Sequence, residues 1–279
     1  MRRRSVPAPV LVVGAVVSVQ IGGALAKHVI KDTGPAGATA LRLFFAAALL
    51  GLLWRPRISR AELPLVVLYG LTLGVMNLLF YEALARTPLG VAVTVEFLGP
   101  LAVAVAGSRR PRDFALVVLA AVGIVLLSRG GGAVNVWGLV LAAMAGSCWA
   151  GYILVSAAVG KRHSGAAPLV VAMFVAFLVS LPFGAATATR ASAHSLLLAA
   201  AIGLMSSVLP YTLELEALRT LPARVFGILM SMEPAIAALA GLVILHEHLT
   251  GRQWLGVACV IAACAVVTAT SRTSEQPVL

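Results

Sequence analysis

Three glutamates lie deep inside long apolar stretches of the sequence: Glu96, Glu214 and Glu233. An ionised carboxylate at such depth in a bilayer is costly, so it is usually paired, buried against protein or functional. Glu96 is the ninth residue of the run 88–107, which places it about 12 Å along a helix that rises about 1.5 Å per residue. The chemistry to consider is therefore charge binding or proton exchange inside a membrane.

Prolines stand close to two of these acids. Pro100 follows Glu96 by four residues, and Pro234 follows Glu233 directly. Proline removes an intrahelical hydrogen bond and leaves a carbonyl free to face a cavity or a ligand. An acid beside an expected kink, found twice, favours a functional role.

Other polar side chains share helical faces at spacings of three, four and seven residues. These groups are Gln20 and Lys27; Asn77 and Tyr81; Trp149, Tyr152 and Ser156; and Ser207, Tyr211 and Glu214. An amino acid zwitterion needs an acceptor for its ammonium and a donor for its carboxylate, which the glutamates with Arg42 or Arg224 could supply. A buried carboxylate could also exchange a proton and couple transport to a proton gradient.

Structural roles are open to several of these residues. The aromatic side chains suit interfacial anchors or core positions equally well: Tyr81, Trp149 and Tyr152. Arg42 could serve as a structural partner for an acid. The small residues Gly70 and Gly74 favour close helix packing.

Metal and disulfide chemistry is not indicated. His246-Glu247-His248 resembles a metal-binding run, but histidines two residues apart at a helix end are a loose pattern, and a solvated loop is favoured. Cys148, Cys259 and Cys264 all lie in apolar runs and suit core positions. We expect no metal and no cofactor.

The elements that must position these residues are long apolar helices. The chain has 279 residues, of which 61% are hydrophobic and 11% charged, unlike an ordinary soluble protein. Apolar runs lie near 9–27, 34–54, 63–83, 88–107, 113–128, 135–158, 167–188, 195–217, 222–243 and 252–270. We predict an all-α polytopic membrane protein with ten transmembrane helices.

The net charge of +11 has a distribution that indicates orientation. With a cytoplasmic N-terminus, thirteen of the 21 Lys and Arg residues fall on the cytoplasmic side and six on the other, while Arg42 and Arg224 lie inside apolar runs. This positive-inside bias places both termini in the cytoplasm. The partner of the basic residues is the lipid bilayer, and nucleic acid binding is not expected.

The sequence repeats itself at an offset of 134 residues. Residues 82–107 and 216–241 share nine identities in 26 without gaps, against about three expected from the composition. We predict two five-helix repeats, 1–129 and 135–279, joined by a Gly-rich connector at 130–134. Because five is odd, the second repeat enters the membrane from the opposite side, a plan typical of secondary transporters whose site lies near the midplane.

The N-terminus imitates a secretory signal. Arg2 to Arg4, an apolar stretch and then Ala24-Leu25-Ala26 resemble such a signal with its cleavage site. Removing this segment would leave nine helices and break the pairing of the repeats. We therefore expect a retained first helix.

Several long stretches carry a family resemblance. They are ATALRLF (38–44), GVMNLLFYEAL (74–84), PLGVAVTVEFLGPLAVAVAGSRRPRDF (88–114), GSCWAGYIL (146–154), LPYTLELEAL (209–218) and LPARVFGILMSMEPAIAALAG (221–241). With them the sequence resembles the drug/metabolite transporter superfamily with its two EamA-type repeats. Within it, the sequence is most similar to the bacterial threonine/homoserine exporter branch.

The resemblance implies a cavity lined largely by the first, third, fourth, sixth, eighth and ninth helices. It also implies efflux of small amino acids, threonine and homoserine first, in exchange for protons. The matching positions are Arg42, Asn77, Tyr81, Glu96, Trp149, Tyr152, Tyr211, Glu214, Arg224 and Glu233. Where the superfamily often has Gly-Glu after its ninth helix, this chain reads His246-Glu247.

We therefore predict a proton-coupled exporter of small amino acids in the cell (inner) membrane, working by alternating access. The alternative is the same carrier fold exporting another small metabolite or a drug-like compound. An enzyme is disfavoured because no nucleophile–base pair stands out at depth. A channel is disfavoured because one chain lacks repeated pore-lining rings. The cargo, the proton stoichiometry, the direction, the arginine–glutamate pairing and the choice between monomer and dimer stay open.

Overall fold

The computed structural model describes residues 7–54, 58–106, 111–128, 134–160, 162, 166–218, 220–221 and 223–270, and every regular element in these ranges is a helix. In chain order the elements are α1 (Ala8–Leu53), α2 (Leu63–Leu84), α3 (Leu89–Glu96), α4 (Leu98–Ala106), α5 (Pro111–Ser128), α6 (Val136–Gly160), α7 (Ala167–Ala188), α8 (Ala193–Gly203), η1 (Leu204–Val208), α9 (Leu209–Leu218), α10 (Ala223–Met230), α11 (Glu233–Leu245) and α12 (Gly251–Thr270).

The described helices are suited to a bilayer. Seven stretches of them are long and apolar enough to cross a membrane, and two shorter apolar helices cover Leu89–Val103 and Phe114–Ser128. The prediction of an all-α, multi-pass membrane protein is confirmed.

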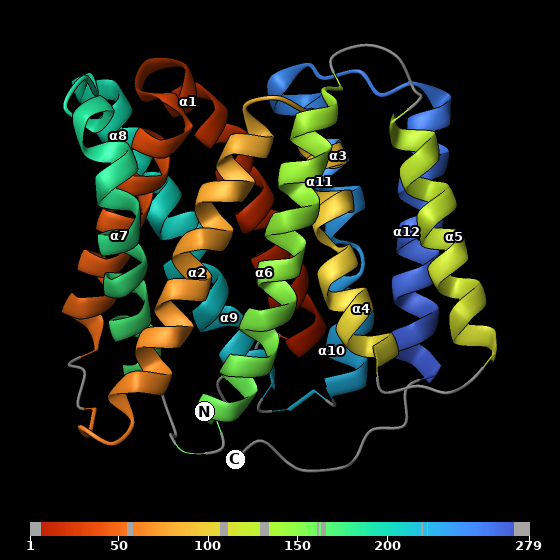
Figure 1. Cartoon of the computed structure of the whole chain (residues 1–279), viewed down its shortest axis with the longest axis horizontal. Helices are drawn as coiled ribbons and strands as arrows, with labels where there is room; N and C mark the ends of the chain where they lie inside the picture. Colours follow the sequence, from red (N-terminus) through yellow and green to blue (C-terminus); the bar gives the residue numbers. More distant parts are fainter. Residues whose placement is uncertain are drawn as a thin grey trace, which may run out of the picture.

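The first helix, α1, spans 46 residues, about twice the length that a bilayer needs. It is divided at Gly34, whose φ of 70° and ψ of 167° are readily adopted only by glycine. Pro35 follows and fixes the start of the second half. The chain therefore turns back at the upper end of the bundle in Figure 1.

The fourth apolar run is broken where the sequence places its acid and its proline. α3 ends at Glu96, and α4 begins at Leu98. Pro100 has no N–H, so the carbonyl of Glu96, four residues earlier, lacks its intrahelical donor. The predicted kink is present, and Glu96 stands at its edge.

A second break lies at the corresponding position of the later sequence. α10 ends at Met230, and α11 begins at Glu233, just before Pro234. The helices α3 and α10 begin 134 residues apart and also end 134 residues apart. Glu96 is thus the last residue before one break, and Glu233 is the first residue after the other.

Pro210 accounts for a third irregularity. It follows η1, a turn of π-helix between α8 and α9, and π turns often mark functional sites. The carbonyl of Ser206, four residues before Pro210, accepts a hydrogen bond from Arg42 Nη2 at 3.3 Å. The carbonyl that proline deprives of its donor is therefore satisfied by a side chain of α1.

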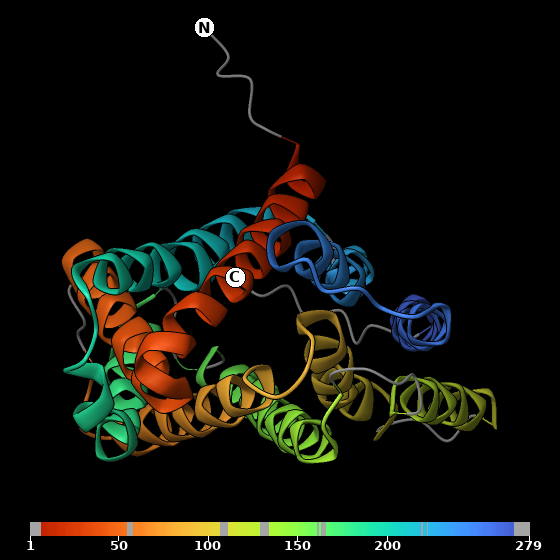
Figure 2. The ribbon, with the colours of Figure 1, turned by 90° about the horizontal axis from the view of Figure 1, so that it is seen from above.

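The helices surround a central space (Figures 1 and 2). α1 contacts α7, α8, α9 and α11, while α2 packs against α6 and α7. α3 contacts both α6 and α11, and α5 packs against α12 at one edge of the molecule. All residues of α3 are buried, whereas α11 packs one face against α1 and α3 and leaves Leu239 and Val243 exposed.

Glycines let α6 cross the α3–α4 break at very short range. A Cβ added to Gly146 would lie 2.5 Å from the carbonyl oxygen of Glu96. One added to Gly99 would lie 1.9 Å from the carbonyl oxygen of Gly146. Both distances are far below van der Waals contact, so these two glycines are required for the position of the break.

Gly146→Ala is expected to lower the stability of the fold by about 1–3 kcal/mol or more, because its Cβ overlaps the backbone of Glu96. The thermal unfolding midpoint in detergent measures the effect. Gly160→Ala on the same helix is the control, since nothing lies within 4 Å of the added Cβ. Equal midpoints for the two variants would mean that α6 does not hold the break in place.

Candidate functional site

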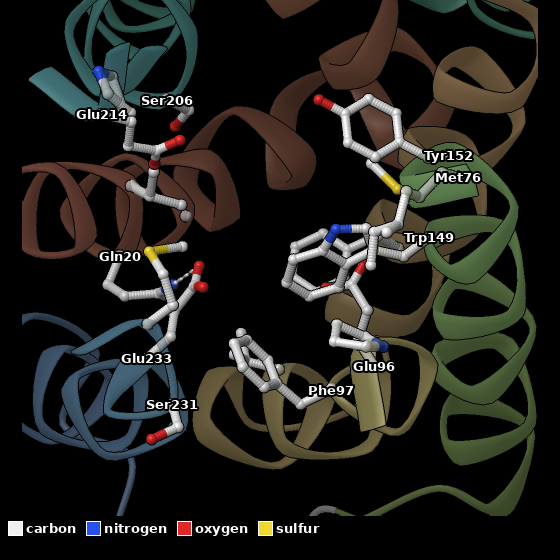
Figure 3. A pocket seen from close by; sticks show the side chains of 18 of the residues that line it. Gln20, Met76, Glu96, Phe97, Trp149, Tyr152, Ser206, Glu214, Ser231 and Glu233 are labelled. Atoms are coloured by element: carbon white, nitrogen blue, oxygen red, sulfur yellow. Dashed lines mark hydrogen bonds between the residues drawn. The ribbon is translucent and has the colours of Figure 1, made fainter. Parts of the chain in front are cut away.

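A cavity of about 440 Å³ lies at the centre of the bundle (Figure 3). Nine of the ten predicted site residues line it: Arg42, Asn77, Tyr81, Glu96, Trp149, Tyr152, Tyr211, Glu214 and Glu233. The tenth, Arg224, belongs to α10, but its side chain lies outside the described residues. Residues from six stretches far apart in the sequence therefore meet around a volume suited to a small molecule.

Two further helices contribute to the wall beyond the six that were predicted. Arg42 comes from the half of α1 after Gly34, the second predicted helix, and Cys264 and Thr268 come from α12. The expectation that the first, third, fourth, sixth, eighth and ninth helices supply most of the lining is confirmed, because only Arg42, Cys264 and Thr268 come from other helices. Polar content did not identify α12 because its contribution is small and nearly apolar.

Three residues of the predicted polar faces do not line the cavity: Lys27, Ser156 and Ser207. Ser207 was expected beside Tyr211, but it is fully buried, and Ser206 lines the cavity instead. The π turn of η1 causes this shift, because its wider turn breaks the three-and-four spacing. Ser156 also stays out of the lining and donates to the carbonyl of Ile153 at 3.0 Å.

Arg42 is held in the wall by neutral groups. Its guanidinium donates to Asn77 Oδ1 and, at 3.3 Å, to the carbonyl of Ser206, and it lies 5.6 Å from the centre of the Tyr81 ring. Among the described residues it forms no ion pair, so the interpretation of Arg42 as a partner for an acid is wrong. Its Nε is buried and has no hydrogen-bond partner. A cation so placed retains charge and a donor for a ligand.

Glu233 has one oxygen bound and one free. Gln20 Nε2 donates to Glu233 Oε1 at 2.9 Å, whereas Oε2 is buried without a partner. Gln20 and Glu233 are only 2% and 7% exposed. Because Glu233 opens α11, the N-terminal end of that helix also favours its negative charge.

Glu96 lies across the cavity from Glu233 (Figure 3). It is 8% exposed, and within the described part of the chain its carboxylate makes no hydrogen bond and no ion pair. Glu214, on α9, lies on the side of Glu233. The cavity therefore presents carboxylates on both of its sides, and none of the described Lys or Arg side chains forms an ion pair with them.

Aromatic rings form the remaining wall. Trp149 meets Phe97 edge-on with ring centres 5.0 Å apart. Tyr152 stacks on Tyr69 at the same distance, and their hydroxyls are 3.0 Å apart. Tyr81 is 2% exposed. The three predicted aromatics are therefore interior residues of the cavity wall and not interfacial anchors.

Sequence reasoning missed Glu247. The solvated loop expected at His246-Glu247-His248 is wrong for this residue, which pairs with Lys27 and accepts from the Leu89 N–H. His246 ends α11 in the left-handed region, with φ 54°, where glycine is usual. The Gly-Glu pair that the superfamily often has at this position was the signal that could have identified Glu247. Among the described residues, no three His, Cys, Asp or Glu side chains are placed to hold a metal ion.

Comparison with known proteins identifies the family. The profile of the EamA-like transporter family matches residues 7–129 and 136–269, which is nearly the whole chain. The chain belongs to the EamA-like transporter family. The described cavity is thus the interior of a membrane transporter and not an enzyme active site.

Two relatives are similar over nearly their full length, and a third over about three quarters of it. The threonine/homoserine exporter RhtA of Salmonella typhimurium is 44% identical, over 99% of this chain and 96% of that protein. RhtA of Escherichia coli K12 is 42% identical, over 96% and 93%. The uncharacterized transporter YwfM of Bacillus subtilis is 30% identical, over 75% and 74%.

A solved crystal structure supports the fold of this EamA-like transporter. It superposes with a TM-score of 0.62 and covers 94% of this chain and 97% of its own, at 20% sequence identity. At that identity the likeness concerns the fold alone.

Gln20→Met is expected to lower the stability of the transporter by about 1 kcal/mol, because Glu233 loses its hydrogen bond in a buried place. The thermal unfolding midpoint in detergent measures this effect. Ser147→Ala is the control, since Ser147 is exposed and bonds only to its own helix. A Gln20→Met midpoint equal to that of the control would argue against the bond between α1 and α11.

Proposed function

We propose that this EamA-like transporter exports small amino acids, threonine and homoserine first, across the inner membrane. The observation that carries the proposal is the 42–44% identity to threonine/homoserine exporters over nearly the full length of both chains. A similarity that spans every helix, including those that line the cavity, favours a shared class of cargo.

The cavity offers both charges that an amino acid zwitterion requires. Arg42 lines the cavity, its Nε has no hydrogen-bond partner, and its guanidinium can bind the carboxylate of the substrate. Glu233 Oε2, also unpartnered, or Glu96 can accept the ammonium from either side of the cavity. Binding would give hydrogen-bond partners to buried polar atoms that have none among the described residues.

The proposed topology has ten membrane crossings in two inverted five-helix repeats, 1–129 and 135–279, with both termini cytoplasmic. α1 is long enough for two crossings. The common offset of 134 residues between α3 and α10 and the two family matches on either side of residues 130–134 support the repeat. The positive-inside bias supports the orientation.

Proton antiport by alternating access is the proposed mechanism. Glu96 and Glu233 lie at helix breaks and line the cavity, and neither forms an ion pair with any side chain that the structure describes. A carboxylate in this position can bind a proton when substrate leaves and release it when a substrate ammonium binds. Each half of the cycle then keeps the buried charge compensated.

Export is tested in cells that lack their own threonine and homoserine exporters. Expression of this chain is expected to give efflux of both amino acids, and a proton uncoupler is expected to abolish it. Efflux that persists with the uncoupler would contradict proton coupling. Absence of efflux from protein shown to be in the membrane would contradict the cargo and lead to a screen of other small metabolites.

Glu96→Gln and Glu233→Gln are each expected to lower export about tenfold or more, because the amide keeps the size of the side chain but cannot take up and release a proton. Initial efflux rates, normalised to protein in the membrane, measure the change. Glu82→Gln is the matched control, since Glu82 lies at the end of α2 in an ion pair with Arg86. Wild-type export in both cavity variants would refute the carboxylate role.

A further inference from the structure

A polar cluster outside the cavity joins three separate segments at the upper end of the bundle. Lys27 on α1 pairs with Glu247, which lies between α11 and α12, and also donates to the carbonyl of Thr87 at 2.7 Å. Glu247 Oε2 accepts from the backbone N–H of Leu89, the first residue of α3, at 2.8 Å. The proposed transport cycle does not yet use these contacts.

Leu89 connects this cluster to the cavity. Its side chain is fully buried and lines the cavity. It also fills the gap between α1 and α11: a Cβ on Gly23 would lie 3.3 Å from Leu89 Cδ1, and one on Gly241 would lie 3.7 Å from Leu89 Cβ. Leu89 therefore packs as a wedge between these two helices. The hydrogen bond from its backbone N–H to Glu247 holds Leu89 in place.

The cluster lies between two hollows. A depression of about 450 Å³ on its outer side is lined by Lys27, Glu247 and neighbouring residues. The central cavity is lined by Leu89 on the inner side, and the two hollows share no lining residue. One layer, made of the ion pair and the leucine, thus separates them.

The cavity-lining residues of α3 that are nearest to the cluster are buried. Leu89, which is bonded to the cluster, is fully buried, and Val93, one turn further along α3, is only 3% exposed. The cavity is therefore closed at the end that carries Lys27.

We propose that Lys27, Glu247 and the N–H of Leu89 form a latch that holds this end of the cavity shut and that must open for substrate to pass. The inference rests on the proposed alternating access. Lys27 and Leu89 belong to the first of the two family matches and Glu247 to the second, so the latch links the two halves that must move apart. Its ion pair is partly solvated, with 17% and 19% of the two side chains exposed, which suits a contact that forms and breaks.

The ion pair between Arg86 and Glu82 provides a matched comparison. Arg86 lines the same outer depression, but its partner Glu82 lies four residues away on α2. Breaking this pair separates no segments from each other. A loss of charge at Arg86 therefore tests the effect of an ion pair alone.

Opening is measured by thiol labelling in the full-length chain. The three native cysteines are replaced by alanine, Val93→Cys supplies a reporter in the cavity wall, and a membrane-impermeant maleimide is added to vesicles of each orientation. His248→Cys, on the exposed loop, identifies the face that carries the latch. Glu247→Ala and Lys27→Met are each expected to speed labelling of the reporter from that face roughly tenfold, and Arg86→Gln is expected to leave the rate unchanged.

The outcomes separate the latch from the cargo, because labelling requires no substrate. Faster labelling in the latch variants supports the latch whether or not threonine is exported. An unchanged labelling rate in both latch variants, or an equal rise in the rate with Arg86→Gln, overturns the latch. Intact export in the same cells would still support the proposed function. Should Glu247→Ala fail to accumulate, Glu247→Gln keeps an acceptor for the Leu89 N–H and tests the charge alone.

Discussion

A backbone carbonyl that loses its donor inside a membrane has to be satisfied within the protein, and this constraint organises the centre of the molecule. Pro100, Pro210 and Pro234 each remove one intrahelical donor, and each lies at a break or a π turn beside the cavity. At Pro210 the freed carbonyl of Ser206 binds Arg42. At Pro100 the freed carbonyl of Glu96 lies against Gly146, where only glycine fits. The breaks therefore determine both the shape of the cavity and the position of its charges.

The charges of the cavity are kept apart by this arrangement. Arg42 is bound by an amide, a carbonyl and an aromatic face, while Glu233 is bound by an amide. If the cation and the acids were paired directly, the site would be neutral and satisfied without a ligand. Neutral partners hold the side chains in place and leave charge available, which is the condition for a site that binds and releases a zwitterion.

Only a few contacts close one end of the cavity. At one end Leu89 is wedged between α1 and α11 under an ion pair that joins distant segments. A transporter needs barriers that are stable but reversible, and one partly solvated ion pair over a single leucine is such a barrier.

Hydrophobic run length and polar periodicity in the sequence determined the membrane class, the approximate extent of the apolar runs and several polar faces of the cavity, because both signals are local properties of a helix in lipid. The resemblance to a known family supplied the full set of ten site residues, nine of which line the cavity. The sequence also predicted the kinks at Pro100 and Pro234, because proline removes a hydrogen bond within its own helical turn. Tertiary structure alone decided the partners of Arg42, the replacement of Ser207 by Ser206 in the wall, and the pairing of Lys27 with Glu247, which is 220 residues away. Such contacts depend on how the helices cross. The spacing of polar residues along one helix does not show which other helix packs against it.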